Sequence, residues 1–115
     1  MVLRHLFLWL LAVSNAASLF GQMNEEEVIL STPTGEIFGS LWIPTEVERP
    51  PIVLIIAGSG PTDRNGNFPM GVNNSLKLLA EGLSSNGIAS LRYDKRGIGQ
   101  SAPAGKAESE MRFED

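Results

Sequence analysis

A small glycine-rich segment, Gly58-Ser59-Gly60, directly follows a run of apolar residues and has the composition of an oxyanion hole. Acyl transfer builds negative charge on a carbonyl oxygen, and backbone N–H groups held in place around that oxygen stabilise it. Such a loop passes close to the substrate, which favours small residues, and we expect the N–H of Ser59 to be the donor. A tight turn between a strand and a helix, with no chemical role, explains the same residues equally well.

Other uses of this loop fail on residue type and spacing. A dinucleotide-binding G-x-G-x-x-G pattern needs glycine where Asp63 stands, and the Gly-Lys-Ser/Thr end of a phosphate-binding loop is absent from the sequence. Asp63, Asn65 and Asn67 alternate as in a calcium loop. However, Phe68 replaces the turn glycine and Asn74 replaces the bidentate glutamate. We therefore expect no cofactor and no metal.

A nucleophile with its base is missing from the sequence. Gly99-Gln-Ser-Ala-Pro103 comes nearest to a G-x-S-x-G elbow, but it follows Arg96 rather than a strand and ends in proline, which argues against Ser101 as a nucleophile. The single histidine is His5, so residues 23–115 contain no imidazole that could activate a serine. Asp and Glu are plentiful, but none is marked as a third member of a triad.

Composition narrows the classes of function further. The absence of cysteine excludes disulfides, thiolate chemistry and cysteine-based zinc sites. The net charge is −4 and the basic residues are mostly scattered, so no nucleic-acid partner is expected. Asp63 and Arg64 could touch substrate, but we expect them to form a surface ion pair with each other.

The residues that must position the loops begin with two strands. Residues 25–32 and 36–44 are rich in β-branched and apolar residues. The Pro33-Thr34-Gly35 turn between them is too short to join parallel strands, so we expect an antiparallel hairpin. Ile52–Ala57 is apolar without alternation, which is typical of a central strand covered on both faces.

A helix and a further strand follow. Apolar residues recur with helical spacing at Leu76, Leu79, Ala80 and Leu83. Asn74 or Ser75 can cap the start of this helix and Gly87 can end it. Residues 88–93 read as a strand and 94–110 as a loop. The predicted fold class is α/β, with the antiparallel hairpin followed by a βαβ unit of a mostly parallel sheet.

The first 22 residues have the three-part layout of a secretory signal peptide. Arg4 and His5 precede an apolar run at 6–13, and small or polar residues follow at 14–18. The run is shorter than the about 20 residues of a membrane-spanning helix, so no stable membrane anchor is expected. Cleavage after residue 16 or 18, or near 22, remains open. We expect a signal peptide at 1–22 and an exported domain, periplasmic or extracellular, at 23–115.

Two motifs together resemble the α/β-hydrolase superfamily. They are Gly58-Ser-Gly-Pro-x-Asp-Arg-x-Gly-Asn67 after one strand and Arg92-Tyr-Asp-x-Arg-Gly-x-Gly-x-Ser101 after the next. Their order, and their separation through one helix, also fit. Within the superfamily the sequence is most similar to EstD-like carboxylesterases and serine-aminopeptidase-like hydrolases. The resemblance covers nearly all of residues 25–115.

The resemblance implies roles for particular residues. Ser59, flanked by Gly58 and Gly60, would supply an oxyanion donor. Structural residues beneath the nucleophile elbow would be Asp94, Arg96, Gly97 and Gly99. The family's Ser-Asp/Glu-His triad is not found here. Residues 23–115 are therefore expected to be the N-terminal portion of the domain, truncated before the elbow.

The function that the resemblance implies is that of an exported serine hydrolase cleaving carboxylic esters, inactive as this portion alone. An exported peptidase of the same fold is an alternative, as is a non-catalytic exported binding or interaction module. The expected partner is accordingly a small-molecule ester or a short peptide.

Overall fold

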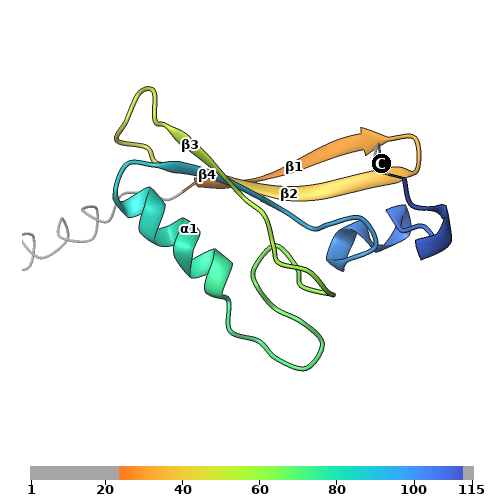
Figure 1. Cartoon of the computed structure of the whole chain (residues 1–115). Helices are drawn as coiled ribbons and strands as arrows, with labels where there is room; N and C mark the ends of the chain where they lie inside the picture. Colours follow the sequence, from red (N-terminus) through yellow and green to blue (C-terminus); the bar gives the residue numbers. More distant parts are fainter. Residues whose placement is uncertain (1–23, 113–115) are drawn as a thin grey trace, which may run out of the picture.

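The structure is a computed structural model that describes residues 24–112, so the predicted signal peptide lies outside the described residues. A four-stranded sheet carries one helix on one face (Figure 1). The elements are β1 (Asn24–Thr32), β2 (Gly35–Ile43), β3 (Ile52–Ile55), α1 (Ser75–Ser85) and β4 (Ala89–Tyr93). The strand order in the sheet is β1-β2-β4-β3. The predicted α/β class is confirmed.

The hairpin forms as the short turn predicts. β1 and β2 pair antiparallel along their whole length, from Asn24 opposite Ile43 to Thr32 opposite Gly35. The hydroxyl of Thr32 donates to the Gly35 carbonyl at 2.6 Å, which closes the turn. Gly35 has φ 137°, and a Cβ there would lie 2.9 Å from Ala104, so the turn also accommodates a later part of the chain.

The βαβ unit forms as predicted, with one difference in position. β3 and β4 pair parallel through the α1 crossover, from Ile52 opposite Ala89 to Ile55 opposite Arg92. β4 also pairs antiparallel with β2, which places β4 and not β3 in the interior of the sheet. Ile52–Ala57 was expected to hold a central strand. Within the described part of the chain its strand lies at the sheet edge, with β4 as its one paired neighbour.

Asn74, one of the two predicted caps, is the N-cap of α1, but it does not cap through its side chain; the end of α1 agrees with the prediction. Asn74 adopts the left-handed conformation (φ 52°) and its side chain makes no capping hydrogen bond. Instead the Asn73 side chain accepts from the N–H of Ser75, and the Asn65 carbonyl accepts from the next two N–H groups. Gly87 (φ 76°) ends the helix as predicted.

The core lies between α1 and one face of the sheet. Trp42, Ile55 and Ala80 are buried together, and Leu76 and Leu83 pack against them. This is the predicted apolar helix face, except that Leu79 is half exposed. Side chains alternate between the faces of a strand, so the neighbours of these core residues project from the opposite face. An 11-residue helix covers only one face of the sheet.

The segment predicted as a loop contains two short 3-10 helices, η2 (Gly99–Ala104) and η3 (Glu108–Glu110). η2 packs against β2, where the Phe38 N–H donates to the Ser101 hydroxyl at 2.9 Å. Over residues 24–112 the structure contains no helix that is both long and apolar enough to cross a bilayer.

Candidate functional site

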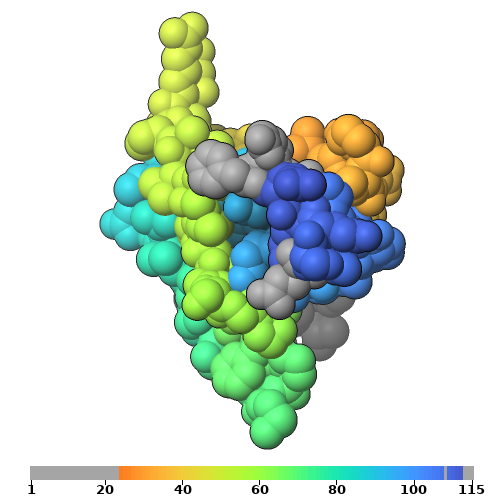
Figure 2. Space-filling view, turned by 45° about the vertical axis from the view of Figure 1, so that its right-hand side comes forward, coloured from red at the N-terminus to blue at the C-terminus, as the bar shows by residue number. Residues whose placement is uncertain are grey.

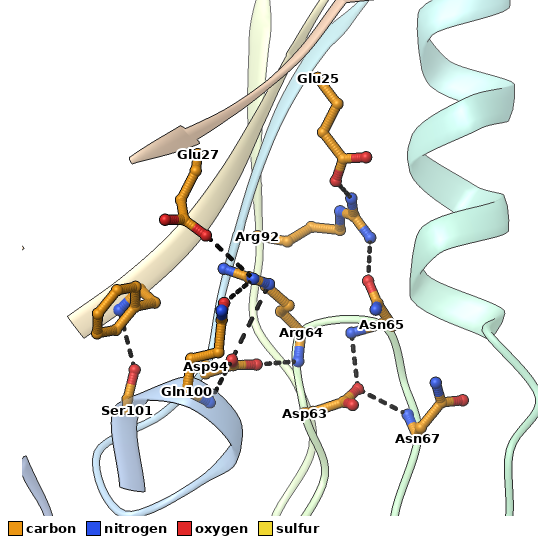
Figure 3. Close-up of polar contacts among 11 residues, drawn as sticks. Glu25, Glu27, Asp63, Arg64, Asn65, Asn67, Arg92, Asp94, Gln100 and Ser101 are labelled. Carbon is orange, nitrogen blue, oxygen red and sulfur yellow. Dashed lines mark hydrogen bonds and ion pairs between the residues drawn. The ribbon is translucent and has the colours of Figure 1, made fainter. Parts of the chain in front are cut away.

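The residues quoted for the two motifs lie at and after the carboxyl ends of two parallel neighbours, β3 and β4. The second motif starts with the last two residues of β4 and ends in the first turn of η2. We call residues 58–74 the first loop and residues 94–101 the second loop. Ligands of open α/β sheets bind outside the carboxyl ends of the strands. Hydrogen bonds and ion pairs join the two loops to each other and to β1 (Figure 3).

Asp94 joins the two loops. Its side chain is 4% exposed. Its Oδ1 accepts from the Arg64 N–H at 2.8 Å, and its Oδ2 accepts from the Gln100 N–H at 3.0 Å. Its own N–H donates to the Phe38 carbonyl of β2. Hydrogen bonds to a charged group contribute about 1.5–3 kcal/mol each, so this carboxylate is a strong point of attachment between the loops.

The predicted ion pair between Asp63 and Arg64 is wrong. The Asp63 carboxylate accepts from the backbone N–H groups of Asn65 (2.8 Å) and Asn67 (3.0 Å), as aspartate commonly does in turns. The Arg64 side chain instead donates to the Gln100 side chain and lies 3.9 Å from carboxylate oxygens of Glu27 and Asp94. Oδ1 of Asp63 is therefore already the acceptor of two backbone N–H groups of the turn.

The alternating polar residues of the first loop organise the loop itself. The side-chain oxygen Oδ1 of Asn67 accepts from the backbone N–H groups of Asn73 and Asn74, and its side-chain NH₂ donates to Oδ1 of Asn74 at 2.8 Å. Gly66 (φ 90°) passes so close to α1 that a Cβ would meet the Ser75 hydroxyl at 2.4 Å. No three His, Cys, Asp or Glu side chains of the described residues are grouped as metal ligands.

Arg92 is a buried cation that sequence reasoning did not assign to the site. Its side chain is 0% exposed, and it donates to Glu25 at 2.6 Å and to the Asn65 side chain at 2.7 Å. The Cζ atom of Arg92 lies 5.8 Å from the centroid of the Trp42 ring. Burial lowers the pKa of Arg92, and the Glu25 carboxylate opposes that effect. The signal available in the sequence was a charged residue in a strand on the same face as Ser90.

The remaining motif residues of the second loop lie against the hairpin and η2. Arg96 donates to the hydroxyls of Thr32 and Thr34 and to the Ala104 carbonyl. Gly97 (φ 83°) donates its N–H to the Ser101 carbonyl at 3.0 Å. Arg96 therefore contacts the ends of β1 and η2, Gly97 contacts η2, and neither Arg96 nor Gly97 lies in a regular strand or helix.

Ser101 has no access to solvent. It is 0% exposed, and its hydroxyl oxygen accepts the Phe38 N–H. A nucleophile must reach its substrate, so this burial agrees with the expectation that Ser101 is not one.

The predicted oxyanion segment lies at the surface. Gly58, Ser59 and Gly60 are all exposed. The Lys95 ammonium, from the second loop, donates to the carbonyl oxygens of Gly58 and Gly60, the latter at 2.8 Å. The N–H of Ser59 donates to no group within residues 24–112. Sequence reasoning missed Lys95, although its place at the end of a neighbouring parallel strand was a usable signal.

The opposite face of the sheet from α1 is open and apolar. A hollow of about 650 Å³ is lined there by β1, β2 and β4, with Val28, Leu30 and Tyr93 among its walls. Leu54 of β3 borders it and is 54% exposed. β3 and the first loop run along the molecular surface as the yellow-green band in Figure 2. Ser59 does not line this hollow.

Comparisons with known proteins agree with the motifs. No protein-family model matches the chain. The esterase EstD of Thermotoga maritima is 43% identical over 58 residues, which is 50% of this chain and 14% of EstD. The α/β hydrolase GrgF from Penicillium sp. sh18 superposes with a TM-score of 0.51 and 25% identity over 68% of this chain and 24% of GrgF.

A cold-adapted esterase from an Arctic intertidal metagenomic library, solved as a complex with PEG, shares the fold. Its TM-score is 0.50 at 22% identity, over 66% of this chain and 29% of the esterase. The described residues thus share the α/β-hydrolase fold with these structures over about two thirds of the chain, and half of the chain is similar in sequence to EstD, as the motifs predicted. It spans 14% of the length of EstD.

Proposed function

We propose that this chain is the N-terminal part of an exported serine hydrolase that cleaves carboxylic esters, with a signal peptide at 1–22. The first loop forms the oxyanion side of its active site, and the triad lies outside residues 24–112. The similarity to EstD and the fold shared with GrgF support the reaction class. The substrate is a small-molecule ester.

The exposed Ser59 N–H carries this proposal. It follows the carboxyl end of β3, where α/β sheets bind ligands, and no group of the described chain occupies it. A serine supplied by the rest of the hydrolase attacks the ester carbonyl, and the carbonyl π electrons move onto the oxygen. The Ser59 N–H donates to that oxyanion. Collapse of the intermediate breaks the ester C–O bond, and the leaving oxygen takes the proton that a base of the triad removed from the serine, so that an alcohol departs. Water then hydrolyses the acyl-enzyme to the acid and the free serine.

Two substitutions of Ser59 in the complete hydrolase test this assignment. Ser59→Ala keeps the backbone donor and should keep most of the activity towards a p-nitrophenyl ester. Ser59→Pro removes the donor, and loss of one oxyanion donor typically lowers kcat about a hundredfold or more. Proline also constrains φ, so melting temperatures must first show that the variant is folded.

Two results would exclude the assignment. Near-normal turnover in folded Ser59→Pro means that the N–H is not an oxyanion donor. A severe loss in Ser59→Ala with the fold intact means that the hydroxyl, not the N–H, is the functional group. Export is tested separately, by sequencing the N-terminus of the protein recovered outside the cytoplasm. An intact Met1 on that protein contradicts a cleaved signal peptide.

A further inference from the structure

Lys95 contacts the predicted oxyanion segment in a way that the motif comparison does not explain. Lys95 immediately follows Asp94 in the second loop, and its ammonium donates to two carbonyls of the first loop, those of Gly58 and Gly60. The partners are 37 and 35 residues away in sequence. A flexible ammonium with three donors suits two acceptors that converge from different directions.

These contacts determine which way one peptide group faces. The described residues have no cis peptide bond, and in a trans peptide the N–H points opposite to the C=O. Because Lys95 holds the Gly58 carbonyl, the Ser59 N–H in the same peptide group points away from the cation. The Gly60 carbonyl precedes Pro61, which has no N–H. Of the two peptide groups that Lys95 holds, only Gly58–Ser59 therefore offers a donor.

The backbone of Gly58–Gly60 needs a constraint from another part of the chain, because its own residues restrict its conformation little. Nothing lies within 4 Å of a Cβ built at Gly58 or at Gly60, and Gly60 has φ 88°. Glycine allows a peptide group to rotate at low energetic cost. After such a rotation the Gly58 carbonyl oxygen would replace the Ser59 N–H and would repel a developing oxyanion. Charge-assisted hydrogen bonds are roughly twice as strong as neutral ones, so the Lys95 contacts oppose this rotation.

We propose that Lys95 is a positioning residue that holds the Gly58–Ser59 peptide with its N–H available to the oxyanion. This inference rests on the function proposed above. In this role Lys95 acts on the reaction through the backbone of the first loop, whose carbonyl groups it contacts. Asp94, anchored to both loops, fixes the base from which the Lys95 side chain extends.

The test compares Lys95→Met, Lys95→Arg and the control Lys77→Met on α1, all in the complete hydrolase. We expect Lys95→Met to lower kcat about tenfold to a hundredfold, as partial loss of an oxyanion donor would, and to leave KM within about twofold. Lys95→Arg should restore part of the loss, and Lys77→Met should match the parent enzyme. The Ser59 amide should exchange its hydrogen faster in Lys95→Met, with the melting temperature little changed.

A double variant separates positioning from general structural damage. If Lys95 acts through the Ser59 N–H, Lys95→Met should add no further loss of kcat to Ser59→Pro. Losses that multiply, or a folded Lys95→Met enzyme with normal kcat, would overturn the inference while leaving the Ser59 assignment standing. A parent enzyme without esterase activity would refute the proposed function instead. In that case unchanged Ser59 hydrogen exchange in Lys95→Met would still refute the positioning role.

Discussion

The carboxylate of Asp94 lies directly against the α-carbon of Gly99. A Cβ built at Gly99 would meet Oδ2 of Asp94 at 2.6 Å and Cγ at 2.7 Å. Gly99 also has φ 52°, a conformation that favours glycine. The backbone of the second loop can therefore approach the carboxylate, and the Gln100 N–H can donate to it, only because residue 99 has no side chain.

Gly99→Ala should destabilise the protein. The left-handed backbone alone costs about 1–3 kcal/mol for a residue with a side chain, and displacement of Asp94 adds to this. Gly82→Ala is a matched control, because it lies within α1 and has nothing within 4 Å of the added Cβ. It should stabilise the protein by about 0.5–1 kcal/mol. Urea unfolding measures both, and equal midpoints for the two variants would contradict this reading of Gly99.

Arg92→Met should destabilise the protein more than Glu25→Gln does. Breaking a fully buried pair costs about 3–5 kcal/mol, but Glu25 is 38% exposed and water can solvate it, so we expect about 2–3 kcal/mol for Arg92→Met. Glu25→Gln leaves the cation with Asn65 and the Trp42 ring. Arg49→Met, at an exposed arginine, is the control. Urea unfolding measures the free energy of unfolding of each variant. If Arg92→Met lowers it no more than Arg49→Met does, Arg92 has no structural role.

Residues 23–115 expressed alone should hydrolyse a p-nitrophenyl ester no faster than their Ser101→Ala variant. Ser101 is buried and this part of the chain has no histidine. Hydrolysis above the buffer rate that disappears in Ser101→Ala would make Ser101 a nucleophile and would refute the proposed division of the active site. In the complete hydrolase Ser101→Ala leaves the Phe38 N–H without its acceptor, which costs about 1–3 kcal/mol.

The same isolated residues should bind a hydrophobic dye or aggregate. Ile52, Leu54 and Ile56 are 61%, 54% and 60% exposed, and an apolar patch of this kind promotes association. Leu54→Thr should reduce dye fluorescence, and the complete hydrolase should bind much less dye per molecule. A monomer that unfolds cooperatively and binds no dye would show that no further segment is needed to cover this apolar face. The alternative function, a non-catalytic binding module, would then be favoured.

Local patterns in the sequence were sufficient for the hairpin and α1 of this fold, although not for the 3-10 helices η2 and η3. The Pro33–Gly35 turn predicted the antiparallel hairpin because its length allows no other connection. The spacing of apolar residues predicted α1, and Gly87 predicted its end, where the N–H groups of Gly87 and Ile88 donate to the carbonyls of Ser84 and Leu83. Each of these signals lies within a few residues of the structure that it specifies.

The contacts of the charged side chains were decided only by the tertiary structure. Arg92 pairs with Glu25, 67 residues away, because β4 lies next to β2 in the sheet and brings Arg92 towards the start of β1. Proximity in sequence favoured a pair between Asp63 and Arg64, but Oδ1 of Asp63 accepts backbone N–H groups of the turn. The Arg64 guanidinium lies instead beside Gln100 and two other carboxylates. Local signals specified the hairpin, the helix and the glycine-rich loop. The strand order then selected the partners of Arg64, Arg92 and Lys95, because long charged side chains bind whatever acceptors the assembled sheet brings within reach.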